Sequence, residues 1–124
     1  MIKKILNSPN FSKNPRNKRD VKLIIIHYTG MQSKIASLKR LTSPKSKVSC
    51  HYLIDRNGTI IKFMDDSKIA WHAGKSKWKS LNNLNKNSIG IELINKGHKY
   101  GFQKYTNQQL NALIKLCIFL KKKY

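Results

Sequence analysis

The sequence predicts an α/β domain in which helices pack on a central β-sheet. Apolar runs of strand length occupy residues 22–28, 48–55 and 88–94. Two stretches with apolar residues at helical spacing, 32–41 and 106–120, are interleaved with these runs. A chain of 124 residues is long enough to bury one hydrophobic core. This alternation of strands and helices predicts a single domain with helices on a sheet.

The N-terminal residues differ from the rest in composition. Residues 1–20 are polar and basic and contain Pro9 and Pro15. We expect them to form an extended basic arm that leads into the first strand. The domain itself is expected to cover residues 21–124.

The first predicted strand runs directly into a histidine. Residues 22–30 read KLIIIHYTG, so that Ile24, Ile25 and Ile26 immediately precede His27. The run is apolar on both faces, as expected for a strand in the middle of a covered sheet. His27 either ends a buried strand by chance or stands on a rigid support as a working group. The pattern of this strand alone leaves both interpretations open.

The next elements are a helix and a β-hairpin. Residues 32–41 have the spacing of an amphipathic helix. VSCHYLID (48–55) and TIIKF (59–63) are then joined by a turn that contains Asn57-Gly58. Asn-Gly between two β-rich runs is the strongest short signal for a hairpin.

The second half of the chain begins with a long irregular stretch. Residues 65–87 have no clear period, and a loop of this length in a compact domain is usually either functional or disordered. The loop contains both tryptophans, which argues against disorder. A strand follows at residues 88–94. The last helix is predicted to begin at a capping box with Thr106 as the N-cap and Gln109 three residues later.

Glu92 is the only glutamate in the chain and lies within an apolar strand. Alternation places it on one face with Ser88, Gly90 and Ile94, so the two smallest side chains of the strand leave space beside it. Burial would raise the pKa of the carboxyl toward the range of a general base. The alternative is a salt bridge to one of the many lysines, and we favour a functional Glu92.

The other histidines differ in their surroundings. His51 lies in a predicted strand and is expected to be structural, whereas His98 is expected in an exposed turn. His72, in AWHAG within the 65–87 loop, suits a substrate contact. A catalytic zinc needs three protein ligands, which His27 alone cannot provide.

The charge balance raises a different possibility. The chain has 26 lysines and arginines against 5 acidic residues, a formal net charge of +21. Such a charge is compatible with nucleic-acid binding, but it is scattered along the sequence. Two cysteines are too few for a disulfide framework. No apolar run is long enough to span a membrane and no signal peptide is evident, which predicts a cytoplasmic protein, with the periplasm as the alternative.

Several motifs together resemble one enzyme family. The segments IIIHYTG, VSCHYLIDRNGTI, AWHAGKSKW and LNKNSIGIELIN and the helix after them occur in the order seen in zinc-dependent N-acetylmuramoyl-L-alanine amidases. The resemblance is to the amidase-2 family of the AmpD and AmiD type, which shares its fold with peptidoglycan recognition proteins. It covers residues 8–120 and implies a mixed central β-sheet flanked by helices.

The resemblance also implies roles for individual residues. His27 would be the first ligand of a zinc ion (Zn²⁺), and Glu92 would be the catalytic base that acts on zinc-bound water. The substrate-binding residues that it implies are Trp71, His72, Ala73 and Asn95. The reaction would be hydrolysis of the amide between the lactyl group of N-acetylmuramic acid and L-alanine, in muropeptides bound by a monomer.

The sequence departs from the family in two places. Cys50 occupies a position where related proteins have an assisting tyrosine, so that role is expected to be absent. The family's other two zinc ligands, a histidine and an aspartate, follow its last helix, whereas here no histidine follows His98 and no aspartate follows Asp66. We therefore expect a C-terminally truncated amidase domain with one zinc ligand and negligible activity. The alternatives are a non-catalytic peptidoglycan-binding module and a basic nucleic-acid-binding protein.

Overall fold

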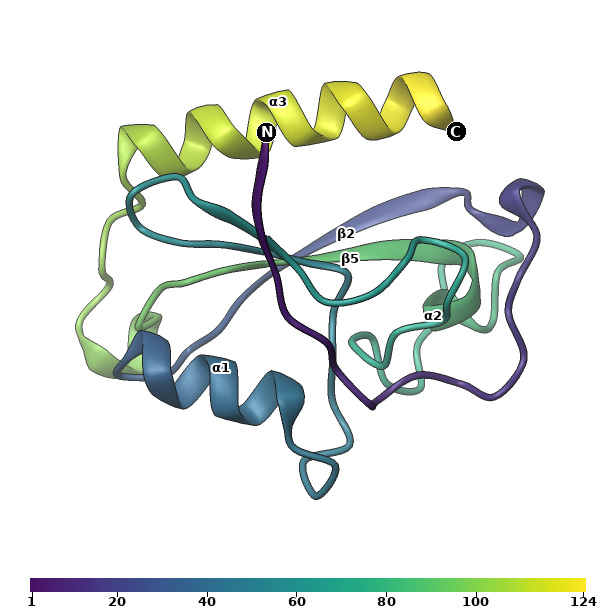
Figure 1. The fold of residues 1–124 in the computed structure, drawn as a ribbon, viewed down its shortest axis with the longest axis horizontal. Coiled ribbons are helices and arrows are strands. Elements are labelled where there is room, and N and C mark those ends of the chain that lie inside the picture. Colours follow the sequence, from purple (N-terminus) through teal and green to yellow (C-terminus); the bar gives the residue numbers. More distant parts are fainter.

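The computed structural model describes residues 1–124 and contains a five-stranded mixed β-sheet with helices on both faces (Figure 1). The strand order is β1-β4-β3-β5-β2. Strands β3 and β4 are antiparallel, and the other three neighbouring pairs are parallel. The predicted fold class, a mixed sheet flanked by helices, is confirmed.

The elements have the following bounds. The strands are β1 (Ile2–Ile5), β2 (Leu23–Tyr28), β3 (Tyr52–Ile54), β4 (Ile60–Lys62) and β5 (Ser88–Leu93). The helices are α1 (Lys34–Thr42), α2 (Leu84–Asn87) and α3 (Asn107–Lys123), with 3₁₀ turns η1 (Lys18–Asp20) and η2 (His98–Tyr100). No helix in the chain combines the length and the apolar composition needed to cross a membrane.

The prediction that the triple-isoleucine strand lies in the middle of the sheet is wrong. Strand β2 is an edge strand that pairs only with β5, and none of its residues is fully buried. Ile26 is 47% exposed. The central position belongs to β5, which pairs with β2 on one side and β3 on the other. An apolar run indicates that a strand has apolar side chains to bury, but it does not determine which strands become its neighbours in the sheet.

The hairpin and the helix starts follow the sequence signals closely. Asn57-Gly58 connects antiparallel β3 and β4, and Gly58 adopts the positive φ of +88° that favours glycine. Thr106 caps α3 by accepting a hydrogen bond from the Gln109 amide at 3.0 Å. The Gln109 side chain does not complete the predicted capping box. It is buried and donates to the carbonyl oxygens of Ile54 and Ile94, which ties α3 to the sheet.

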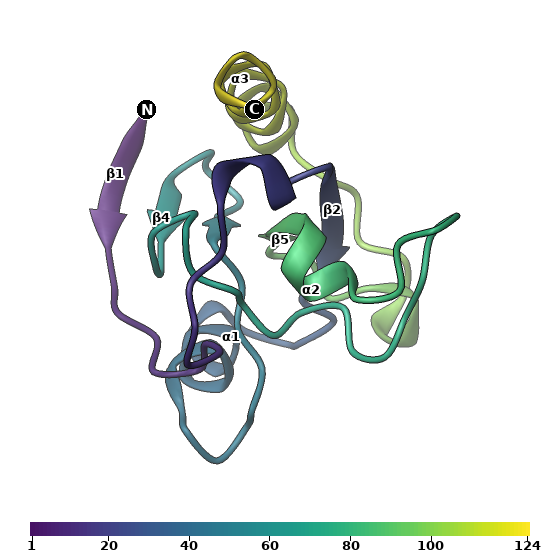
Figure 2. The same cartoon turned by 90° about the vertical axis from the view of Figure 1, so that its right-hand side faces the viewer.

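The two faces of the sheet are covered by different helices, α3 on one side and α1 on the other (Figure 2). Side chains of the sheet that point toward α3 form one apolar cluster with that helix, namely Tyr52, Ile54, Ile60, Ile89, Ile91, Leu93, Leu116 and Leu120. A second cluster lies on the α1 side and comprises Leu41, Cys50, Leu53, Ile61, Phe63 and Ile94. The side chain of Glu92 points to the α1 side, as the alternation along β5 predicted.

The N-terminal residues, predicted to form an extended basic arm, contribute β1, which pairs with β4 at the other edge of the sheet. Arg16 is buried and joins this segment to two distant ones. Its guanidinium donates to the carbonyl oxygens of Asp66, Asn85, Lys86 and Ser88. These hydrogen bonds hold the N-terminal segment against the backbone at the start of β5.

Candidate active site

A cavity of about 210 Å³ opens on the α1 side of the sheet. It is lined by side chains from β2, α1, β5 and the segments around residues 48 and 71, including His27, Arg40, Trp71, His72 and Glu92. His27 and Glu92 are direct partners in the parallel β2–β5 register. Because partners in a parallel register point to the same face, the two sequence-predicted residues lie side by side at the cavity.

The carboxyl group of Glu92 has one oxygen atom that is removed from solvent without gaining a hydrogen bond. Its Oε2 atom is buried and has no hydrogen-bond partner. Burial raises the pKa of Glu92 to about 7, and the positive charge of Arg40 opposes this rise. A carboxyl group with a pKa near neutrality can both take up and release a proton at physiological pH.

His27 forms its only side-chain hydrogen bond with another histidine. The distance between His27 Nε2 and His72 Nδ1 is 2.9 Å, and the two rings meet edge to face. Burial lowers the pKa of His27, and burial followed by the proximity of His27 lowers the pKa of His72 to about 3. Both rings are therefore neutral at pH 7.

The small residues on the Glu92 face of β5 make room for the His72 ring. A Cβ atom built on Gly90 would lie 2.5 Å from Cγ and Cδ2 of His72, so no larger residue fits beneath the ring as it stands. Ser88 Oγ lies 3.1 Å from the His72 Nε2 atom. The prediction that Ser88 and Gly90 leave space for another group is confirmed, and the group is His72.

The AWHAG segment is held by hydrogen bonds from several parts of the chain. Asn85 Oδ1 accepts the backbone amides of His72 and Ala73 at 3.1 and 2.8 Å. The Trp71 amide donates to Ser49 Oγ, and the indole Nε1 donates to Ser12 Oγ. Trp71 and His72 line the cavity, whereas Ala73 is not among the lining residues. Both nitrogens of His72 already have partners, so any substrate contact would involve its carbon edge.

Asn95 lies apart from this group. Its side chain is buried, accepts the amide of Gly97 and donates to the carbonyl of Gln103. It borders a different depression, together with His98. The structure therefore does not bring Asn95 together with the other predicted site residues, and its role in substrate binding stays a prediction.

His51 is structural, as its sequence position indicated. It is fully buried, and its Nδ1 accepts a hydrogen bond from the Gly90 amide at 3.1 Å. Since Nδ1 is the acceptor, Nε2 carries the proton and donates to the carbonyl oxygen of Lys68 at 2.8 Å. Burial, as the largest cause, lowers the pKa of His51 to about 4, so the ring is neutral at pH 7.

No tyrosine hydroxyl from β3 reaches the cavity. Cys50 is fully buried, and burial together with the charge of Glu92 raises the pKa of its thiol. The hydroxyl of Tyr52 points to the other face of the sheet and donates to Asp66 Oδ1 at 2.7 Å. The expectation that an assisting tyrosine is absent at position 50 agrees with this arrangement.

The zinc ion implied by the family resemblance can be compared with the donors that are present. No three His, Cys, Asp or Glu side chains lie close enough together to hold a metal ion. At 2.9 Å, the His27 and His72 nitrogens are closer than the ~3.3 Å that separates two ligands of a tetrahedral zinc with Zn–N of about 2.0–2.1 Å. These two histidines are thus arranged for a hydrogen bond, and the residues present do not form a complete zinc site.

Sequence reasoning missed two residues of the site, Arg40 and Asn85, and the hydrogen-bonding role of Ser88. Arg40, on α1, is the cation that lines the cavity with Glu92, and it looked like any other lysine or arginine of an exposed helix face. Asn85 and Ser88 hold the AWHAG segment and the His72 ring. For Ser88, the small side chain on the Glu92 face was a usable signal, whereas Asn85 had none.

Comparisons with known proteins agree with this geometry. The family described as N-acetylmuramoyl-L-alanine amidase (Amidase_2) matches residues 17–124. The chain is 30% identical over 136 aligned positions to the 1,6-anhydro-N-acetylmuramyl-L-alanine amidase AmpD of Haemophilus influenzae, covering 96% of this chain and 71% of that protein. It is 38% identical over 109 positions to the N-acetylmuramoyl-L-alanine amidase AmiD of Escherichia coli, covering 77% of this chain but only 38% of AmiD.

Solved structures show the same fold. The E. coli AmiD complex with the substrate anhydro-N-acetylmuramic acid-L-Ala-D-γ-Glu-L-Lys superposes with a TM-score of 0.75 at 31% identity, covering 91% of this chain and 47% of that one. AmpDh3 from Pseudomonas aeruginosa in complex with anhydromuramic pentapeptide gives a TM-score of 0.78 at 29% identity, covering 96% of this chain and 52% of that one. The chain therefore belongs to the N-acetylmuramoyl-L-alanine amidase family.

Proposed function

We propose that this chain binds muropeptides and carries the general base of an N-acetylmuramoyl-L-alanine amidase. The reaction is hydrolysis of the amide that joins the lactyl group of N-acetylmuramic acid to L-alanine. The observation that carries the proposal is Glu92, a half-buried carboxyl group with a buried, unpaired Oε2 atom and a pKa of about 7, beside His27 at an open cavity.

The role proposed for Glu92 is proton transfer. Its carboxylate would take a proton from the attacking water, and the resulting acid would pass that proton to the departing amine of L-alanine. A pKa near 7 suits both steps, because the group is basic enough to accept the proton and acidic enough to return it. The buried Oε2 atom has no hydrogen-bond donor to stabilise a negative charge, which favours uptake of the proton by the carboxylate.

The substrate class is proposed from the relatives and from the lining of the cavity. The solved complexes of AmiD and AmpDh3 contain anhydromuramic peptides. In this chain Trp71 offers an apolar wall and Arg40 a positive charge at the same cavity. An amphipathic, negatively charged peptide attached to a sugar would find both kinds of contact there.

For zinc, we propose that His27 serves as one ligand, as the family resemblance implies. Bound zinc would supply Lewis-acid polarisation of the reacting carbonyl and of water. The residues present supply one such ligand where a catalytic site needs three. We therefore expect the 124-residue chain to bind zinc weakly and to hydrolyse muropeptides negligibly by itself. Stoichiometric zinc by metal analysis, together with release of stem peptide, would contradict this expectation.

The catalytic role of Glu92 is tested in a chimera that completes the ligand set. A C-terminal segment that carries the histidine and the aspartate implied by the family resemblance is appended to this chain, and release of stem peptide from anhydro-muropeptide is followed with added zinc. We expect turnover in the chimera and a loss of about 10²–10⁴-fold in kcat in its Glu92→Gln variant, since a positioned general base contributes that much.

The matched control is Asp65→Asn, which removes an exposed carboxylate (78% exposed side chain) away from the cavity and should leave turnover unchanged. A Glu92→Gln chimera with full activity would contradict the proposed role. If the chimera binds zinc and muropeptide but gives no turnover, the second candidate function, a non-catalytic peptidoglycan-binding module, is favoured. The incomplete set of metal ligands is the observation that supports this candidate.

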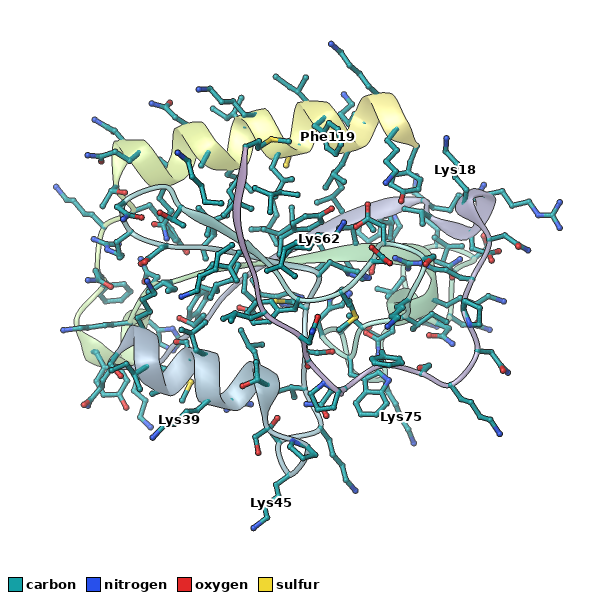
Figure 3. All side chains as sticks on the ribbon, viewed as in Figure 1. Lys18, Lys39, Lys45, Lys62, Lys75 and Phe119 are labelled. Carbon is teal, nitrogen blue, oxygen red and sulfur yellow. The ribbon has the colours of Figure 1, made fainter.

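Nucleic-acid binding is the weaker interpretation of the +21 charge. The lysines labelled in Figure 3, which include Lys18, Lys39, Lys45 and Lys75, lie at well-separated places around the molecule. Binding through such a surface would weaken steeply with salt and would not respond to Glu92→Gln. Muropeptide binding should respond to changes at the cavity.

A further inference from the structure

His72 links His27 to the main chain through consecutive hydrogen bonds. The first joins His27 Nε2 to His72 Nδ1 at 2.9 Å, and the second joins His72 Nε2 to Ser88 Oγ at 3.1 Å. The third is donated by the Ser88 hydroxyl to the carbonyl oxygen of Leu84. The series of hydrogen bonds thus runs through side chains from β2, the 65–87 loop and β5, and its last acceptor is a backbone carbonyl oxygen in α2.

The Leu84 carbonyl, the last acceptor in this series of hydrogen bonds, determines where each of the three protons lies. A carbonyl oxygen can only accept, so the single hydroxyl proton of Ser88 is directed to Leu84. Ser88 Oγ must then accept from His72, which places the His72 proton on Nε2 and leaves Nδ1 as an acceptor. His27 must in turn donate from Nε2 to His72.

We propose that His72 is a positioning residue that fixes the tautomer of His27, with the proton on Nε2 and the free lone pair on Nδ1. In metal sites, a hydrogen bond from the remaining ring nitrogen of a histidine sets which nitrogen binds the ligand. Any cation or proton donor that uses His27 as a base must therefore approach Nδ1. The same hydrogen bond also fixes the orientation of the His27 ring.

The surroundings of His72 are built for this ring. Gly90 lies beneath it in the central strand, where glycine weakens a strand and usually marks a close approach. Asn85 accepts the backbone amide of His72, so the main chain is held as well as the side chain. Neither ring nitrogen of His72 is left free for a substrate. These constraints indicate that the His72 ring positions His27 and does not make a direct polar contact with a ligand.

This inference deepens the proposed function, since it explains how His27 is prepared for that site, but its test does not use activity. The ¹⁵N-labelled protein is prepared without metal, and the ring nitrogens are observed by NMR at pH 7.5. A scalar coupling across the hydrogen bond should join His27 Nε2 to His72 Nδ1. The shared proton should show its one-bond coupling to His27 Nε2, and the single ring N–H proton of His72 should be on Nε2.

Two variants separate positioning from a merely structural role. His72→Phe keeps an aromatic ring but removes both nitrogens, and it should abolish the coupling and leave His27 as a mixture of tautomers. Ser88→Ala is a smaller change that removes only the acceptor for His72 Nε2. The reversed arrangement, in which His72 donates from Nδ1 and His27 carries its proton on Nδ1, then becomes allowed and should be populated.

Ser49→Ala is the matched control, because it removes a hydrogen bond from the Trp71 amide of the same loop without altering the chain of hydrogen bonds through His72. Its His27 tautomer should equal that of the wild type. The proposal is overturned if wild-type His27 carries its proton on Nδ1, or if Ser88→Ala leaves the tautomer unchanged. It is also overturned if Ser49→Ala alters the tautomer as much as Ser88→Ala does. None of these results would bear on whether Glu92 acts as a base.

Discussion

The two faces of the central strand β5 perform different tasks with alternating residues. Ile89, Ile91 and Leu93 point to α3 and are buried in an apolar cluster. On the other face, Ser88 provides a hydrogen-bond acceptor, Gly90 provides space, and Glu92 provides a half-buried carboxyl group. One face stabilises the strand by burying apolar area. That stabilisation offsets the free-energy cost of placing a carboxyl group in a poorly solvated environment on the other face.

The largest effect is expected on the α3 face. Leu116→Ala should lower the free energy of unfolding by about 2–5 kcal/mol, because it deletes a fully buried side chain and leaves a cavity. Chemical denaturation followed by circular dichroism measures this loss. Ile118→Ala, on the same helix but 51% exposed, should change stability by less than about 0.5 kcal/mol. Equal losses in the two variants would contradict the conclusion that apolar burial between α3 and the sheet supplies this stability.

Glu92→Gln should have the opposite sign on the other face. The pKa of Glu92 is about 7 in the folded chain against 4.5 for an ordinary glutamate. Between these values the folded protein holds a proton that the unfolded chain has lost, so stability falls as pH rises from about 4.5 to 7. The variant should therefore be more stable than the wild type at pH 8 by on the order of 3 kcal/mol.

The measurement is urea unfolding of both proteins at pH 4.5 and pH 8, and the quantity of interest is the difference between them. Other titrating groups, including the buried histidines, contribute equally to both proteins and cancel. Asp65→Asn provides the control for loss of an exposed acid. If the difference between Glu92→Gln and wild type does not grow with pH, Glu92 is not the strained carboxyl group described above.

Gly90→Ala should have a smaller effect that depends on His72. A new Cβ would meet the imidazole ring at 2.5 Å, and crowding of this kind costs about 1–3 kcal/mol. In a His72→Ala background the same substitution should be neutral or slightly stabilising, because the space is then empty. Urea denaturation of the four proteins of this double-mutant cycle gives the coupling. Additive effects would show that the cost of Gly90→Ala does not arise from contact with the His72 ring.

The difference between the faces also explains what the sequence could predict. Alternation is a local property, so the position of Glu92 beside Gly90 and Ser88 was predicted correctly from seven consecutive residues. The Asn57-Gly58 hairpin and the Thr106 cap are local for the same reason. The place of β2 in the sheet was predicted wrongly, because strand order depends on pairing between distant segments.

The partner of His27 was equally hidden from the sequence. His72 lies 45 residues away from His27 in the sequence. Hydrogen bonds with Arg16, Asn85 and Ser49 hold the loop that carries His72. The AWHAG motif indicated that this loop was important, but it gave no direction for the imidazole ring. The family resemblance implied a substrate contact for His72, and the structure adds a histidine pair that motif reasoning does not contain.

The smallest effect concerns Arg40, the one positive charge that opposes the strain on Glu92. Arg40→Gln should raise the pKa of Glu92 above about 7, because the charge of Arg40 lowers that pKa in the wild type. The change should be small and should diminish with added salt, since Arg40 is exposed and its charge is screened by solvent. Titration of the ¹³C-labelled Glu92 carboxyl group by NMR measures it directly. Lys39→Gln removes the neighbouring exposed cation, which does not line the cavity, and should leave the titration of Glu92 in place. If both variants shift that titration equally, the carboxyl group senses the overall positive charge of the chain rather than Arg40, and a substrate anion would have no particular reason to bind beside it.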